Sequence, residues 1–305
     1  MRGIRAGALA LSVLVAPALG GIFHQNFEVD STANWVVNNG PSDAAADFFF
    51  DYSTVGIPAS PGGGGTRGMK LQANLTNGIF GGMSASPVGL NLAGDYVVSF
   101  DWWSNVNGPF PGGGSGSTNL STFGVGTAGT TAQWAGGVQD SVWFAATGDG
   151  NSSADWRAYS SAAGTSYPDG SPVYPYTTRN HNNAYFAGFG GVAAPAAQLA
   201  LFPQQTGTTL VGSAGMEWHE VEIAKLGNTI TWHVDGLLMA TIDTNTVTLG
   251  GGNIFFGHSD TNTTSSTDVN DAALLFTLID NVSVVPEPSG VLLLGLGGLL
   301  ALRRR

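Results

Sequence analysis

The sequence contains no cysteine among its 305 residues. Disulfides therefore cannot stabilise the fold, which must depend on a buried core or on bound ions. Positive charge is also scarce: between positions 21 and 285 the chain has five basic residues against twenty acidic ones, a net charge of −15. Because phosphate binding needs clustered Lys and Arg, this composition excludes a nucleic-acid partner.

Sustained helical periodicity is missing as well. Short runs of aromatic and β-branched residues recur instead between clusters of Gly and Asn, which is typical of strands and turns. The chain has 46 Gly, 8 Trp and 16 Phe, so it has many turns and enough apolar surface to fold. We predict one all-β domain over residues 21–285. Strands are expected at 48–52, 68–73, 96–103, 138–147, 155–160, 184–189, 254–257 and 274–285.

The first twenty residues have the pattern of a secretory signal peptide. Arg2 and Arg5 precede an apolar run over 6–15, and small residues follow at Ala16 to Gly20. This order of basic, apolar and small residues predicts export and removal of residues 1–20.

The last twenty residues, 286–305, have three parts in order. A Pro-Glu-Pro tripeptide, Pro286, Glu287 and Pro288, precedes an apolar stretch over 290–302. This stretch is short for a helix that spans a bilayer, which needs about 20 residues. The chain then ends in a basic triplet that favours the cytoplasmic side of a membrane: Arg303, Arg304 and Arg305.

This arrangement resembles the PEP-CTERM sorting signal of Gram-negative bacteria. The resemblance implies transient insertion into the inner membrane and cleavage near Pro286, Glu287 and Pro288 by an exosortase-type protease. It also implies delivery to the cell surface or the extracellular matrix. An ordinary C-terminal tail anchor is the alternative.

Residues 217–243 predict a three-stranded meander with turns at Gly227-Asn228 and Asp235-Gly236, since these dipeptides tolerate positive φ. The Trp-His-x-Val-x-Ile opening and the Val-Asp-Gly-x-x-x-Ala-Thr close of this segment resemble concanavalin A-like and laminin-G-like jelly rolls. The resemblance implies an antiparallel β-sandwich of two sheets. The final run, LFTLIDNVSV, also resembles galactose-binding-like jelly rolls, which remain the alternative topology.

Within this last run, period two places Asp280 on one face with Phe276, Leu278, Val282 and Val284. A buried carboxylate needs a partner, so Asp280 should meet backbone amides, a hydroxyl or a cation. If the first and last strands lie together, Glu28 approaches Asp280, and the two carboxylates are candidates for a structural calcium site.

An enzymatic interpretation needs two carboxylates about 5–9.5 Å apart across a glycosidic bond. Glu220 and Glu222 lie two residues apart on one predicted strand face, at a separation of roughly 7 Å. They are the candidates for a glycoside hydrolase, although we interpret them as solvent-facing charges.

Sugar binding is the other small-ligand hypothesis, because aromatic faces stack on pyranose rings while Asn and Asp bond their hydroxyls. The candidates lie between 134 and 185: Trp134, Trp156, Tyr159, Asn151 and Asp155. We therefore expect an exported, non-catalytic β-sandwich that binds polysaccharide or is a structural component of the matrix.

Overall fold

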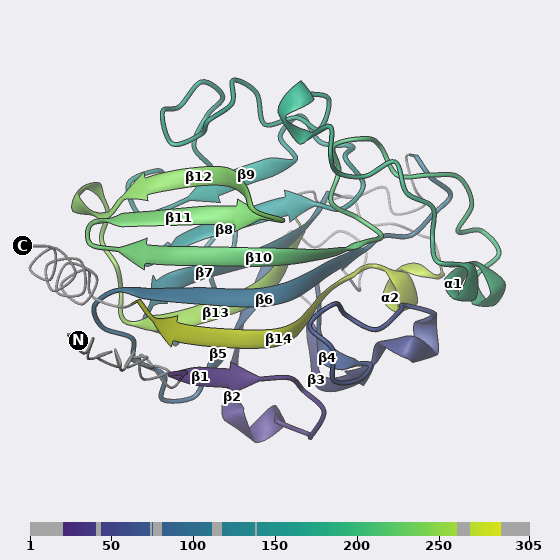
Figure 1. Cartoon of the computed structure of the whole chain (residues 1–305), viewed down its shortest axis with the longest axis horizontal. Coiled ribbons are helices and arrows are strands. Elements are labelled where there is room, and N and C mark those ends of the chain that lie inside the picture. The colour runs from purple at the N-terminus through teal and green to yellow at the C-terminus, as the bar shows by residue number, and fades with distance from the viewer. Residues whose placement is uncertain are drawn as a thin grey trace, which may run out of the picture.

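The computed structural model describes residues 21–40, 44–73, 75, 81–111, 118–137, 139–260 and 269–287. Within them the chain forms two antiparallel β-sheets that pack face to face, one of eight strands and one of six (Figure 1). The predicted all-β, two-sheet sandwich is therefore confirmed.

We call the eight-stranded layer sheet A and the six-stranded layer sheet B. Sheet A has the order β12 (Leu237–Asp243), β11 (Thr229–Val234), β10 (Trp218–Leu226), β6 (Tyr96–Asn105), β14 (Phe276–Pro286), β4 (Arg67–Gln72) and β3 (Ala45–Asp51), and β1 (Phe23–Gln25) pairs with β14. Sheet B has the order β2 (Trp35–Asn39), β5 (Gly81–Pro87), β13 (Asn253–Asp260), β7 (Asn119–Thr127), β8 (Val142–Thr147) and β9 (Trp156–Tyr159).

Short helices join some of these strands. The α-helices are α1 (Ala196–Leu201) and α2 (Asp271–Leu274). The 3-10 helices are η1 (Thr32–Asn34), η2 (Tyr52–Val55), η3 (Ala184–Phe186) and η4 (Thr244–Thr246).

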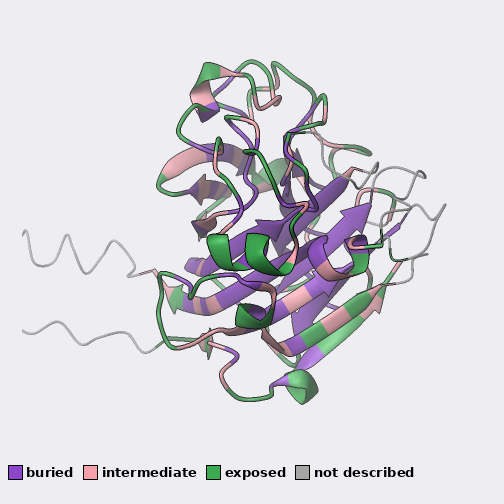
Figure 2. Cartoon of the chain, turned by 90° about the vertical axis from the view of Figure 1, so that its right-hand side faces the viewer, coloured by how far each residue is buried: buried purple, intermediate pink, exposed green. Residues whose placement is uncertain are grey.

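The core lies between the sheets and is rich in aromatic side chains. On β11, Ile230, Trp232 and Val234 are buried and alternate with partly exposed residues, as the period of a strand requires. Trp232 stacks on Phe144 of sheet B with ring centroids 4.9 Å apart. Figure 2 shows that the buried residues run along the strands, whereas the exposed ones lie mainly on loops and short helices. Burial of such rings supplies the stability that disulfides do not.

The predicted meander is confirmed. Strands β10, β11 and β12 pair in sequence order, and their turns use positive φ at Gly227 (53°), Asp235 (50°) and Gly236 (76°). The pairing of β1 with β14 confirms that the first and last strands lie together.

Strand β14 departs from strict alternation at its centre. The register shifts between Asp280 and Ser283, and Asn281 has φ 51°. One extra residue reverses which face the following side chains occupy. Val282 therefore belongs to the core between the sheets, whereas Phe276 belongs to a separate apolar cluster on the outer face of sheet A. The prediction that one face carries Phe276, Leu278, Asp280, Val282 and Val284 was therefore wrong for Val282 and Val284.

Two kinds of strand prediction failed. Residues 184–189 are not a strand, because Asn183 caps the 3-10 helix η3 by accepting a hydrogen bond from Tyr185 N. Conversely, four observed strands were not predicted: β1, β2, β5 and β7. Strand β5 has the sequence GGMSASP. Small residues occupy β5 because a loop packs closely on its outer face, where Gln133 N donates to Ser84 Oγ.

Candidate functional site

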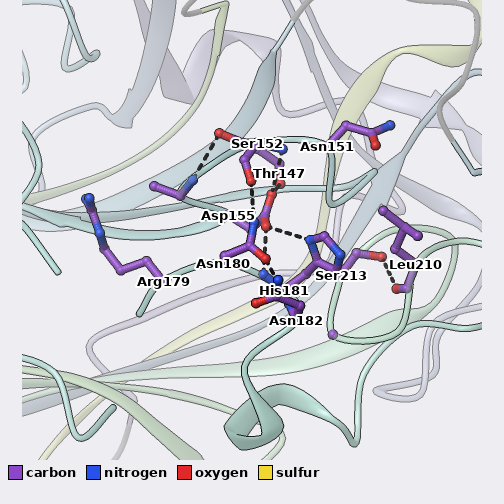
Figure 3. A network of polar contacts seen from close by, with 12 residues as sticks. Thr147, Asn151, Ser152, Asp155, Arg179, Asn180, His181, Asn182, Leu210 and Ser213 are labelled. Carbon is purple, nitrogen blue, oxygen red and sulfur yellow. Dashed lines mark hydrogen bonds and ion pairs between the residues drawn. The ribbon is translucent and has the colours of Figure 1, made fainter. Parts of the chain in front are cut away.

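A buried carboxylate organises the loops at the β9 end of sheet B. The Asp155 side chain is fully buried. Its Oδ1 accepts from Thr147 Oγ1 at 2.6 Å and from Ser152 N at 3.1 Å. Its Oδ2 accepts from His181 N at 2.7 Å and lies 3.1 Å from His181 Nδ1 (Figure 3). Four donors compensate the cost of burying this charge.

This arrangement fixes the orientation of the His181 ring. Because Nδ1 faces Asp155, Nε2 is the ring nitrogen left for another partner. No hydrogen bond within the described chain uses Nε2. The nearby Ser213 hydroxyl donates to Leu210 O at 2.7 Å (Figure 3), so its proton is not directed toward the imidazole. Ser213 is therefore not aligned as a nucleophile with the Asp155–His181 pair.

Short-range contacts hold the segment that carries His181. Asn180 Nδ2 donates to Ser152 O at 2.7 Å, which ties the segment to the loop between β8 and β9. Gly212 has φ 88°, and a Cβ at this position would collide with the His181 carbonyl oxygen. Only glycine allows so close an approach of the two backbones.

His181 opens onto a pocket of about 390 Å³. Its polar lining residues are His181, Asn182 and Asn183. Its apolar lining residues are Ala184, Ala187, Leu210 and Val211. The Asn183 side chain caps η3, but no hydrogen bond within the described chain uses the Asn182 side-chain amide. The pocket lining thus combines an unbonded side-chain amide and an imidazole with aliphatic side chains.

The aromatic residues predicted to stack on sugar are not placed to do so. Trp134, Trp156 and Tyr159 are all at most 5% exposed. Trp156 lies in the core and donates Nε1 to Gly212 O at 3.0 Å. These three predictions were wrong because large aromatic rings contribute most to stability when they are buried in a core.

The two polar predictions had mixed outcomes. Asn151 is exposed but does not line the pocket. Asp155 is fully buried, and its carboxylate contacts His181. Sequence reasoning missed the lining residues Leu210 and Val211. The polar run RNHNN at 179–183 was a signal for the polar lining residues.

The outer face of sheet B is filled by the chain itself. Trp143 stacks on Tyr159 with ring centroids 3.7 Å apart, and Trp143 is fully buried. Residues 128–137 pack over the β5 side of this face, where a Cβ at Gly82 would meet the Trp134 side chain. A large ligand therefore has no free access to this part of sheet B.

Glu220 and Glu222 lie on the outer face of sheet A. Both are exposed, which confirms that they face solvent. Glu220 borders two shallow pockets of about 280 and 240 Å³, and Glu222 borders the smaller one beside His233. Both glutamates therefore lie open to solvent at the margins of these pockets.

Glu28 and Asp280 each accept hydrogen bonds from other parts of the protein. Asp280 Oδ2 accepts from Tyr52 OH at 3.1 Å and from Ser60 Oγ at 3.0 Å, and Glu28 Oε1 accepts from Arg67 N at 3.1 Å. Burial raises the pKa of Asp280 to about 7. Both carboxyl groups therefore already have hydrogen-bond partners within the protein. The described residues contain no cluster of three His, Asp or Glu placed to hold a metal. The hydroxyl and backbone partners expected for Asp280 are confirmed.

The C-terminal sorting residues are described only in part. Strand β14 includes Pro286, which pairs with Tyr96, and Glu287 N donates to Asp95 O at 3.1 Å. Pro288, Arg303, Arg304 and Arg305 lie outside the described residues, as does the predicted signal peptide at 1–20. Among the described residues, no helix is long and apolar enough to cross a membrane.

No protein-family model matches the chain, and no curated protein matches it. Similar solved structures include a Bacillus subtilis protein of unknown function with a galectin-like fold, at TM-score 0.47 and 10% identity over 88% of this chain and 97% of that one. A Bacillus licheniformis β-glucanase has TM-score 0.41 and 13% identity over 88% and 99%. The Emp47p carbohydrate recognition domain has TM-score 0.41 and 9% identity over 83% and 88%. Likeness at these levels carries no argument about function.

Proposed function

We propose that this protein is a non-catalytic glycan-binding protein, and that the pocket at His181 is its binding site. The observation that carries the proposal is the pairing of an aliphatic wall with free polar groups in one cavity. The C–H face of a sugar ring packs against Leu210 and Val211. Its hydroxyls bond to the Asn182 amide and to His181 Nε2, since both groups are left unbonded by the protein.

The absence of an assembled catalytic set among the described residues supports binding over catalysis. The Asp155–His181 pair has no aligned serine, because Ser213 donates its proton elsewhere. Glu220 and Glu222 are exposed and lie on the outer face of sheet A, away from the His181 pocket. Binding needs only positioned donors and acceptors, whereas hydrolysis also needs an acid and a nucleophile.

We further propose that the protein is exported and works at the cell surface or in the extracellular matrix. The support is the signal-peptide pattern at 1–20 and the PEP-CTERM-like segment at 286–305. An exosortase-type protease is the expected processing partner, with transient insertion of the C-terminal segment into the inner membrane.

The charge of the domain narrows the ligand class. Its net charge is strongly negative, with five basic residues against twenty acidic ones between positions 21 and 285. Such a surface repels polyanions. The ligand is therefore a neutral polysaccharide, not a uronic-acid or sulfated polymer.

A glycan array compares wild type, Asn182→Ala and Asn151→Ala. We expect wild type to bind neutral polysaccharides, and Asn182→Ala to weaken this binding about tenfold through the loss of one hydrogen bond. Asn151→Ala is the matched control, because Asn151 is also exposed but lies outside the pocket lining. The proposal is refuted if wild type binds no glycan on the array, or if all three proteins bind equally well. Release of reducing sugar that disappears in Glu220→Gln or Glu222→Gln favours a glycoside hydrolase instead.

A further inference from the structure

The edge strands of the two sheets differ in whether loops of the described chain form hydrogen bonds with them. At the β9 edge of sheet B, Tyr167 N donates to Ala158 O at 3.0 Å and Trp156 N donates to Arg179 O at 3.1 Å. At the β12 edge of sheet A, Thr241 N donates to Val173 O at 2.8 Å. Loops thus satisfy backbone groups on both edges. The opposite edge of sheet B is β2, which pairs with β5 on one side only.

The backbone groups that β2 leaves unpaired follow from its register. Asn34 O accepts from Val88 N at 2.8 Å, and Gly40 N donates to Gly82 O at 2.8 Å. Hydrogen-bonded positions alternate along an antiparallel strand, so residues 34, 36, 38 and 40 face β5. The N–H and C=O groups of Val37 and Asn39 point the other way. No hydrogen bond within the described chain reaches them.

The β2 edge also lacks the features that usually prevent strand addition. Natural edge strands carry Lys, Pro or a bulge. Strand β2 reads WVVNN, has no charge, and keeps an unbroken register with β5. Val36 and Val37 are each 40% exposed. Within the described chain, this edge is therefore exposed, uncharged and free of a bulge.

We propose that the β2 edge is the interface of a homodimer, in which β2 pairs antiparallel with β2 of a second copy about a two-fold axis at Val37. This edge is self-complementary. In each copy, Val37 N–H donates to the Val37 C=O of the other copy. Likewise, Asn39 N–H of each copy donates to the Trp35 C=O of the other copy. Every bond occurs twice, as an isologous interface requires. The lack of charge lets two copies of a chain with net charge −11 approach without opposing acids.

This interface is short, so it binds weakly. A five-residue strand buries less area than a stable dimer needs, which predicts a dissociation constant of roughly micromolar magnitude. The inference does not depend on the proposed glycan site. If both hold, a dimer has two pockets, and a polymer that occupies both gains avidity.

Sedimentation equilibrium of the full chain over roughly 1–500 µM tests the dimer. We expect a reversible monomer–dimer transition and slower amide exchange at Val37 and Asn39 as the concentration rises. Val37→Lys places opposed charges at the axis and shifts the transition at least tenfold toward monomer. Val37→Pro removes the outward N–H at a position where an edge strand tolerates proline, and has the same effect. Leu226→Lys, at another exposed apolar residue, is the control and leaves the transition unchanged.

Circular dichroism identifies any variant that fails to fold, and amide exchange of the wild type does not depend on the variants. A monomer at every concentration overturns the proposal. A dimer that persists in both Val37 variants, or that does not protect Val37 and Asn39, overturns it as well.

Discussion

At the residue scale, Asp155 determines the local structure of the candidate site. Its carboxylate joins the loop after β8 to the segment that carries His181. The sequence around Asp155 did not predict this contact, because its partner His181 lies 26 residues further along the chain. Asp155 was predicted as a ligand contact, whereas the structure shows its carboxylate buried and hydrogen-bonded to the protein.

Asp155→Asn will destabilise the fold by about 2 kcal/mol. In the variant, the Asn side-chain NH₂ replaces the carboxylate oxygen that accepts from His181 N. Two donors then face each other, so His181 N loses its hydrogen bond. Urea unfolding measures the change, and Asn151→Ala is the control with a change within about 0.5 kcal/mol. Equal stabilities of Asp155→Asn and wild type would show that the network does not order these loops.

Asp280 makes stability depend on pH. Burial raises its pKa from 3.8 to about 7, so the folded state holds this proton more tightly than the unfolded chain does. The resulting contribution to the free energy of unfolding is complete below about pH 4 and is lost as the pH rises to about 7. Urea unfolding at several pH values will show this decline in wild type. Asp280→Asn imitates the protonated carboxyl group, so the loss of stability between about pH 4 and 7 should be smaller in this variant. The same pH dependence in variant and wild type would contradict a raised pKa of Asp280.

At the element scale, the sequence predicted those strands whose two faces differ. The meander of β10, β11 and β12 alternates buried and exposed residues, and its turns contain glycine at positive φ. Strand β5 shows no such alternation, because both its faces are buried. Its glycines and serines accommodate a distant loop, and this long-range packing leaves no periodic signal. The bulge in β14 was hidden for a similar reason, since Asn281 also bonds Ser60 and Asp101 from other elements.

Gly257 shows how closely sheet B is packed. A Cβ at this position of β13 would collide with the Met83 carbonyl oxygen on β5. Gly257→Ala will therefore cost more than about 2 kcal/mol. Gly164→Ala, where a Cβ meets open space, is the matched control and changes stability by less than about 0.5 kcal/mol. Thermal unfolding of both variants decides the point, and similar melting temperatures would contradict the packing argument.

At the scale of the whole molecule, the proposed export predicts a shortened chain. We expect the protein to be recovered outside the inner membrane with its N-terminus near position 19 or 21 and its C-terminus near Pro286 to Pro288. Mass spectrometry of the native protein measures both ends. An intact chain of 305 residues inside the cell would contradict the proposal, because neither terminal pattern would then act as a signal.

The most direct test of the account locates the glycan on the folded protein. NMR chemical-shift mapping with a neutral oligosaccharide that the array identifies reports which backbone amides sense the ligand. The account predicts shifts at residues 181–187 and 210–213, which vanish in Asn182→Ala. Shifts confined to the outer face of sheet A around Glu220, or to sheet B around Trp143, would contradict it.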